Sequence, residues 1–205
     1  ALTRTVSYTP DYVSCREAQQ VVEPSSTAYK VTEVFGYDAF GNINSEAITG
    51  IGMTARTTTT NWGATGQFPI TINNALGQPT QRGYDYSKGV QTSETDPNNV
   101  PTSWGYDNFA RRILETRPDG TTTATTYNAC ASVSGGCQNG DPGSTVTSVN
   151  KMVVIATQKD TAATAIRDEW TYLDQLDRTI VTKSKTLTGS YSRVGTQFDA
   201  FGRIS

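Results

Sequence analysis

The sequence predicts an all-β protein in which consecutive antiparallel hairpins form a curved, repeat-built sheet. Three observations lead to this fold class. Among the 205 residues, 34 Thr and 10 Tyr suit a pleated, half-buried surface, and 18 Gly supply turns. A short phrase recurs along the chain, and the segments between its copies alternate in the manner of strands.

The recurring phrase has five copies: YDAFGN at 37–42, NNALGQ at 73–78, YDNFAR at 106–111, LDQLDR at 173–178 and FDAFGR at 198–203. Each copy has an acid or amide, any residue, Phe or Leu, a turn residue, and then Asn, Gln or Arg. The acid or amide positions are 36, 33, 67 and 25 residues apart, so the longest step is close to two shorter ones. One copy means little, but five at comparable spacing indicate a repeat protein.

Each copy predicts one hairpin turn. An aromatic residue ends a strand, Asp or Asn caps the turn, Phe or Leu turns back into the core, and Gly takes the left-handed conformation without steric cost. Ala110 and Asp177 replace that Gly, and because Asp tolerates positive φ better than Ala, we expect the turn at Ala110 to differ most. The structural repeat positions are Tyr37, Asp38, Phe40, Gly41, Asn74, Leu76, Gly77, Tyr106, Asp107, Phe109, Asp174, Leu176, Phe198, Asp199, Phe201 and Gly202.

The segments between these turns are interpreted as strands at 54–62, 68–73, 79–86, 112–117, 121–127, 149–158 and 167–173. The Asp119-Gly120 pair predicts a further hairpin, because Asp-Gly suits turns that match strand twist. A looser hairpin is expected at 96–99. Only residues 15–22 (CREAQQVV) are interpreted as a short helix.

The three cysteines allow one short disulfide. Cys130 and Cys137 flank a flexible ASVSGG loop that can close to disulfide geometry, which we expect in an exported protein. Two reduced side chains are the alternative. Cys15 has no evident partner, and three cysteines without histidine make a poor zinc site, so we expect no metal and no cofactor.

Composition excludes several classes of function. The chain has no His, which removes Ser–His–Asp and Cys–His catalysis and every His-ligated metal site. Its net charge of −2 disfavours nucleic-acid binding. No run of 18 apolar residues is present, so no membrane span is expected, and the chain reads as a piece of a longer protein.

Three clusters could carry chemistry, and each has a simpler interpretation. Asp168 and Glu169 resemble a glycosidase pair, but neighbouring strand residues point to opposite faces, so we expect no enzyme. The repeated aspartates could bind calcium, but about 30 residues separate one from the next, and turn capping explains them. The aromatic residues are expected to pack between strands, with Trp62, in a Gly-rich run, retained as a ligand contact for carbohydrate.

The phrases at 37–42, 106–111 and 198–203, with Pro118-Asp119-Gly120-Thr121 as an inter-strand turn, resemble the YD (Rhs) repeats of large bacterial surface and toxin proteins. This family includes wall-associated proteins and the B and C subunits of insecticidal toxin complexes. The resemblance covers about 27–205, with a Cys-flanked Gly-rich insertion at about 129–144; residues 1–26 are leading strands or a partial repeat.

The resemblance implies a spiralling β-sheet that forms part of a shell around a C-terminal toxin or effector domain. The expected partners are that cargo domain and neighbouring YD repeats, and the expected location is secreted or on the bacterial cell surface. The family's self-cleaving DPxG-type site is not matched, since Asp141-Pro142-Gly143 lacks the spacer and is interpreted as a turn.

Two further expectations follow from the predicted sheet. Its two unsatisfied edges predict self-association through an edge strand. The alternative function is a cell-surface adhesion or carbohydrate-binding module, in which Trp62 would contact a glycan.

Overall fold

The computed structural model describes residues 4–130, 152–186, 188–199 and 201–204. These residues form an all-β structure with no α-helix, so the predicted fold class of successive antiparallel hairpins is confirmed. None of the described segments provides a helix of the length and apolar character that crossing a membrane requires. The chain divides into two compact units, residues 1–101 and 102–205.

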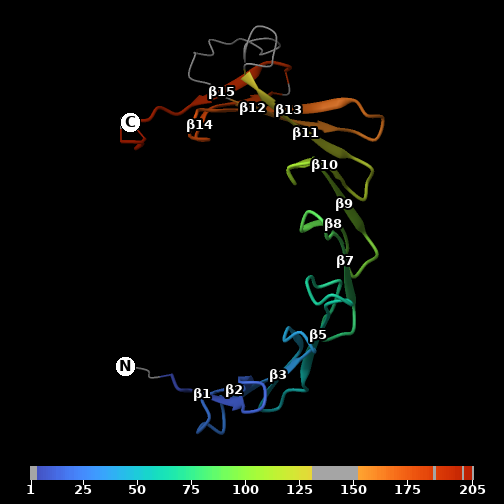
Figure 1. Cartoon of the computed structure of the whole chain (residues 1–205), viewed down its shortest axis with the longest axis vertical. Helices are drawn as coiled ribbons and strands as arrows, with labels where there is room; N and C mark the ends of the chain where they lie inside the picture. Colours follow the sequence, from blue (N-terminus) through green and yellow to red (C-terminus); the bar gives the residue numbers. More distant parts are fainter. Residues whose placement is uncertain (1–3, 131–151, 187, 200, 205) are drawn as a thin grey trace. The chain divides into compact units, whose positions relative to one another are not determined.

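In the first unit every strand pairs antiparallel with the next along the chain (Figure 1). The strands are β1 (Val6–Asp11), β2 (Arg16–Val22), β3 (Val31–Tyr37), β4 (Ile43–Gly50), β5 (Arg56–Asn61), β6 (Thr71–Asn73), β7 (Pro79–Asp85) and β8 (Val90–Thr95).

The second unit follows the same rule, again with antiparallel pairing of successive strands. Its strands are β9 (Pro101–Tyr106), β10 (Arg112–Thr116), β11 (Thr122–Ala129), β12 (Met152–Lys159), β13 (Ala165–Leu173), β14 (Thr179–Lys185) and β15 (Tyr191–Gly195). Because the order is sequential, alternate turns leave the sheet at the same end of the strands.

The helix expected at 15–22 is wrong, because this segment forms strand β2. Glu, Ala and Gln favour helices in isolation, but intrinsic propensity is a weak prior that tertiary context overrides. Here Gln19–Val22 pair with Val31–Val34 on β3, and the opposite side of β2 pairs with β1. The two ladders hold the strand and satisfy its backbone groups.

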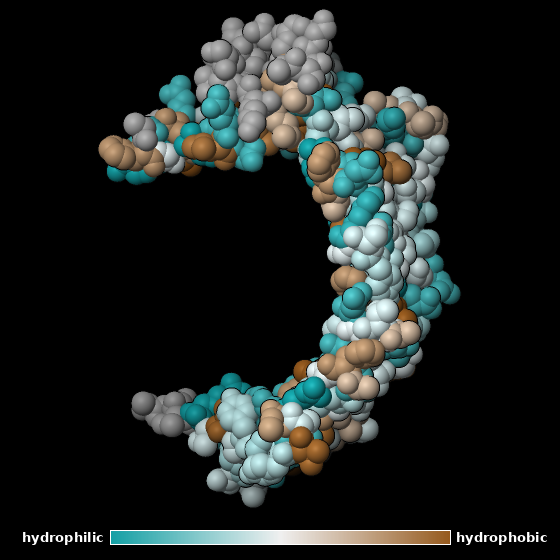
Figure 2. Space-filling model, viewed as in Figure 1, coloured by the Kyte–Doolittle hydropathy of each residue, from teal (hydrophilic) through white to brown (hydrophobic). Residues whose placement is uncertain are grey.

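Few side chains are fully buried. Among the described residues of the first unit, Val21 is the one buried hydrophobic residue. In the second unit, Cys130, Val153 and Tyr172 form a small core, against which Ile155 and Trp170 pack. Apolar and polar residues intermingle on the face drawn in Figure 2, as expected where each hairpin packs mainly on its neighbours.

Candidate functional site

The repeated turn is the feature that the structure defines most sharply. Within the described residues, nine hairpin turns share one hydrogen-bond pattern: the first residue donates its N–H to the carbonyl four residues on, and the fourth donates to the carbonyl of the first. Five are the turns predicted from the phrase. The nine turns span 38–42, 74–78, 96–100, 107–111, 117–121, 160–164, 174–178, 186–190 and 199–203.

The fourth residue of every such turn has positive φ, as in a three-residue hairpin loop that ends in a left-handed residue. Five of these positions are Gly, and the others are Asn99, Ala110, Ala163 and Asp177. The expectation that the turn at Ala110 differs most is wrong. Its φ of 60° and its two backbone hydrogen bonds, of 3.0 and 3.1 Å, match the other turns, so the rest of the turn imposes the strained conformation on Ala.

The first residue of seven turns is Asp or Asn, and its side chain holds the turn. In Asp38, Oδ1 accepts hydrogen bonds of 2.9 Å from the N–H groups of both Phe40 and Asn42. Asn74, Asp96, Asp107, Asp160, Asp174 and Asp199 repeat this double acceptance. The repeated aspartates therefore act on their own turns, as the sequence predicted.

In the turns that begin with Asp38, Asp107, Asp174 and Asp199, the side chain of the fifth residue supplies a partner for the second oxygen of the carboxylate. Arg178 donates from Nε and Nη2 to Asp174 Oδ2 at 2.8 and 2.7 Å, and Arg111 and Arg203 contact their aspartates in the same way. In the turn that begins with Asn74 the direction of donation is reversed, because the first residue donates: Asn74 Nδ2 donates to Gln78 Oε1 at 2.9 Å. The first and fifth residues are thus a matched pair.

These contacts lower the pKa values of Asp38, Asp107, Asp174 and Asp199. The Arg178 side chain is the main cause of the lowered pKa of Asp174, which is only 3% exposed, and backbone N–H groups add to it. For Asp38 burial acts to raise the pKa, but hydrogen bonds from Asn42 and the backbone outweigh it. Each carboxylate is therefore stabilised in its charged form.

The third residue of the phrase does not turn into the core, and that expectation is wrong. Phe40, Leu76, Phe109, Leu176 and Phe201 are 59%, 83%, 80%, 72% and 84% exposed. The side-chain oxygen of the first residue, a carboxylate or the amide of Asn74, accepts a hydrogen bond from the N–H of this position, which fixes the backbone at the tip of the turn. We call these residues, and the equivalent third residues of the other turns, the turn tips.

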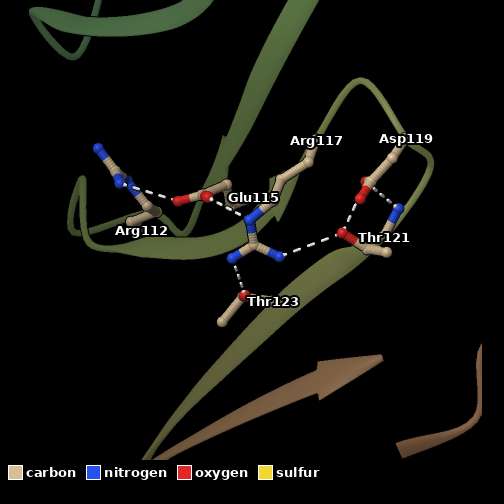
Figure 3. A network of polar contacts seen from close by, with 6 residues as sticks. All are labelled: Arg112, Glu115, Arg117, Asp119, Thr121 and Thr123. Atoms are coloured by element: carbon tan, nitrogen blue, oxygen red, sulfur yellow. Dashed lines mark hydrogen bonds and ion pairs between the residues drawn. The ribbon is translucent and has the colours of Figure 1, made fainter. Parts of the chain in front are cut away.

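The turn at 117–121 reaches the same backbone geometry with different side chains (Figure 3). Its first residue is Arg117, whose guanidinium contacts Glu115 at 3.2 Å and donates to Thr123 Oγ1 at 2.6 Å. Asp119, at the tip, accepts from the N–H and hydroxyl of Thr121 at 2.9 and 2.7 Å. Pro118 and Gly120 preset the backbone, so a capping Asp at the first position is dispensable here.

Two tyrosines, Tyr37 on β3 and Tyr127 on β11, tie their strands to the preceding strand. Tyr37 donates its hydroxyl to the Glu17 carbonyl at 2.7 Å, and Tyr127 donates to the Arg112 carbonyl at 3.2 Å. An arginine covers the ring in both cases: Arg16 lies 5.3 Å from the Tyr37 centroid and Arg111 lies 4.3 Å from that of Tyr127. Arg178 likewise lies 4.4 Å from the Phe198 ring.

Sequence reasoning missed the glycine that precedes three of the YD pairs. Gly36, Gly83 and Gly105 lie where a Cβ would crowd a side chain of the paired strand: Ser45 on β4, Ser93 on β8 and Leu114 on β10, respectively. The strand register shifts beside each of them. The signal was available, because the tripeptide Gly-Tyr-Asp occurs at 36–38, 83–85 and 105–107.

The side chains of the other candidate residues make contacts within the fold. Trp62 is half-buried, and its indole N–H donates to the Ile43 carbonyl at 2.9 Å. Asp168 accepts from Tyr191 at 3.4 Å, whereas Glu169 pairs with Arg167 at 3.6 Å.

Cysteine and metal predictions fall partly outside the described residues. Cys130 is disulfide-bonded and Cys15 is free and exposed. Cys137, Asp141-Pro142-Gly143 and most of the predicted insertion lie outside the part of the chain that the structure describes. Within that part, no three Cys, Asp or Glu residues gather in a way that could hold a metal ion.

Solved structures share this architecture over nearly the whole chain. The TcdB2-TccC3 complex superposes with a TM-score of 0.60, and the TcdB2-TccC3-Cdc42 complex with 0.59, each at 12% identity. Both comparisons cover 98% of this chain and 12% of the other. The Tc holotoxin pore of Photorhabdus luminescens gives 0.60 at 11% identity, with 98% and 11% covered.

The chain has the fold of a Tc toxin segment. No family model matches the sequence, and no curated protein matches it. At 11–12% identity the likeness concerns the arrangement of strands and turns alone. The YD-repeat resemblance of the sequence and this structural likeness agree on a repeat sheet found in toxin complexes.

Proposed function

We propose that this chain is a non-catalytic structural segment of a large exported bacterial Rhs/YD-repeat protein. In this proposal it forms part of a β-sheet shell that encloses a C-terminal toxin or effector domain of the same parent and helps to deliver it. The partners are that cargo domain and the neighbouring repeats. The observation that carries the proposal is the likeness to Tc toxin structures across 98% of the chain, in a fold made of one repeated hairpin.

The use of the polar residues supports a structural role. The acids of the repeated phrase, which would be the natural candidates for catalysis, each cap a turn, and three of the four pair with an arginine. A group whose lone pairs are occupied by its own turn is not free to take a proton from a substrate. Hairpins that contact mainly their neighbours can be added in number without a shared core, which suits a wall.

Protease protection of the full-length parent tests enclosure. If the sheet encloses a cargo, the C-terminal domain of the intact parent should resist a protease, and should become cleavable at the denaturant concentration that unfolds the repeats. The Asp174→Ala variant should lower that concentration, whereas Ala162→Ser, at an exposed tip, should leave it unchanged.

Two outcomes would contradict the proposal. A C-terminal domain that is cleaved equally with and without intact repeats is not enclosed. Glycan binding by the chain that is lost in Trp62→Phe, a variant that keeps a ring but removes the indole N–H, would instead favour the surface-binding function.

A further inference from the structure

Strand β6 in the first unit is too short to cover its neighbour β5. It consists of Thr71–Asn73 and pairs with residues 59–61 of β5, which begins three residues earlier, at Arg56. After Asn73 the chain leaves the sheet into the turn at 74–78. The first half of β5 is therefore an edge inside the sheet, on the side that faces β6.

The direction of the backbone along β5 shows which groups this edge leaves unpaired. The Asn61 carbonyl accepts the Ile70 N–H at 2.8 Å, so it points toward β6. Alternate residues of a strand direct both N–H and C=O to the same side, and no register shift interrupts the pairings of β5, so Thr59 and Thr57 point the same way. Thr59 pairs with Asn73, but no hydrogen bond among the described residues engages the backbone of Thr57 on this side.

A groove of about 760 Å³ lies beside this unpaired stretch. Its walls are residues 52–56, which lead into β5, and residues 74–76 of the next turn. Met53 and Leu76 contribute apolar side chains that are 44% and 83% exposed. At Gly52 a Cβ would meet no atom within 4 Å, so this wall leaves the groove open. The volume lies within the range of sites that take up a ligand.

The groove is positively charged. Arg56 is exposed, and its guanidinium forms no ion pair within the part of the chain that the structure describes. The lining contains no Asp or Glu. A second groove of about 620 Å³ shares Met53 and adds the cation of Lys30, while its one acid, Glu23, already accepts a backbone N–H at 3.0 Å. A ligand that carries carboxylates therefore complements both grooves.

The unpaired backbone of Thr57 favours a polypeptide over other elongated anions. An extended peptide supplies the N–H and C=O groups of a sheet ladder, which a fatty acid lacks. Its successive side chains point to opposite faces, so acidic residues for Arg56 can alternate with apolar residues for Met53 and Leu76. We propose that an extended segment of a partner protein, with alternating acidic and apolar residues, docks in this groove as a short strand beside Thr57.

The length of the unpaired edge sets the strength of this contact. Thr57 offers one donor and one acceptor, and the groove adds contacts with Arg56, Met53 and Leu76. Such a surface is smaller than the roughly 1,200–2,000 Å² of stable interfaces, so the dissociation constant should lie above about 1 μM. The site differs from pairing through the outer strands β1 or β15, because it lies between two strands of the same sheet.

Peptide binding tests the groove. The probe is the peptide Glu-Leu-Glu-Val-Glu-Leu-Glu with fluorescein at its amino end, and fluorescence anisotropy should show saturable binding with a dissociation constant between about 1 μM and 1 mM. Arg56→Glu should weaken binding at least about 10-fold through like-charge repulsion. The matched control Arg193→Glu makes the same change at an exposed position of β15 and should bind as the unchanged chain does. No saturable binding, or equal loss in both variants, would overturn the proposal.

A backbone-modified peptide tests docking as a strand. The same sequence methylated at every internal backbone nitrogen keeps its side chains but cannot donate ladder hydrogen bonds. It should bind at least about 10-fold more weakly than the unmodified peptide. Equal binding of the two peptides would show that side chains alone make the contact, which would overturn docking as a strand.

Amide hydrogen exchange locates the contact. The Thr57 amide should exchange rapidly in the free chain and at least about 10-fold more slowly with saturating peptide, whereas the Thr59 amide, already paired with Asn73, should change little. Dodecanoate, which has a carboxylate and an apolar tail but no peptide groups, should not slow exchange at Thr57. Protection of Thr57 without peptide, or equal protection by dodecanoate, would overturn the proposal. None of these results depends on enclosure of a cargo, so the groove and the proposed function can fail separately.

Discussion

Within one turn, the residues differ in what fixes their identity. In seven of the nine described turns the first position supplies a side-chain acceptor that reaches two backbone N–H groups, and the fourth position has positive φ in all nine. Both requirements come from the backbone, so they recur. The tip is free of them, which is why Phe109 and Asp119 can occupy equivalent places in the same kind of turn.

Ala110 should be a site of stored backbone strain. Its φ of 60° is unfavourable for Ala but free for Gly, and relief of about 1 kcal/mol exceeds the entropy that Gly adds to the unfolded chain. We expect Ala110→Gly to raise the free energy of unfolding by about 0.5 kcal/mol, measured by urea denaturation. The control Ala47→Gly, in strand β4 without positive φ, should lower it by about 0.5–1 kcal/mol. Destabilisation by both substitutions would contradict the presence of backbone strain at Ala110.

Two glycines with similar φ should respond differently to alanine. Gly77 has φ of 75° and no atom near its missing Cβ, whereas a Cβ on Gly41 would displace the Arg16 guanidinium that covers Tyr37. Gly77→Ala should destabilise by about 1 kcal/mol through the backbone alone. Gly41→Ala should cost about 0.5–1 kcal/mol more, the value of the lost stacking. Equal losses in thermal unfolding would show that Arg16 contributes nothing.

At the scale of the hairpin, the first and fifth residues act as one interchangeable pair. Asp174 with Arg178 and Asn74 with Gln78 hold the same turn through opposite directions of donation. The pair also joins hairpins, because Arg178 continues to the ring of Phe198. The effect of substituting one member of the pair on stability should therefore depend on which residue occupies the other position.

The pair predicts a specific rescue. Asp174→Asn should destabilise by about 1–3 kcal/mol, because Asp174 is buried and the Arg178 guanidinium loses its charged partner. The double variant Asp174→Asn, Arg178→Gln recreates the pair found at Asn74 and Gln78 and should recover much of the loss. Part of it should remain, because Gln cannot cover Phe198 as Arg does. A double variant no more stable than Asp174→Asn would contradict the pairing.

At the scale of the whole molecule, stability has two opposite dependences on pH. Asp107, Asp174 and Asp199 have lowered pKa values, so their contribution to the free energy of unfolding is present above their ordinary pKa near 3.9 and is lost as pH falls through the folded value. The pKa of Glu33 is shifted in the opposite direction. Its raised pKa, due first to its hydrogen bond with Glu46 and then to burial and the charges of Glu46 and Glu17, favours the protonated form.

Glu33→Gln should therefore stabilise the chain at neutral pH. The contribution of Glu33 is present below its ordinary pKa of about 4.3 and is lost as pH rises through the raised folded value. The melting temperature of Glu33→Gln should exceed that of the unchanged chain at pH 7, and the difference should vanish below about pH 4. Glu46→Gln should act similarly, and the double variant should add little. A difference that persists at pH 3.5 would point to another cause.

Sequence reasoning succeeded where a local rule was enough. The capping aspartates and the glycines of the phrase follow from turn chemistry, and they lie in one shared geometry. It failed for Phe109 and Leu176, which were expected inside, because apolar character says nothing about direction once a turn has fixed the backbone. It failed for 15–22 because pairing with two strands outweighed helix propensity.

The sequence by itself determined the fold class, the positions of five turns and the residues that cap them, because each depends on groups within five residues of one another. Only the tertiary structure decided the register between paired strands, which arginine covers which ring and that the apolar tips are exposed. These depend on register between segments about 20 residues apart, and a shift of one residue moves every side chain of a strand to the other face.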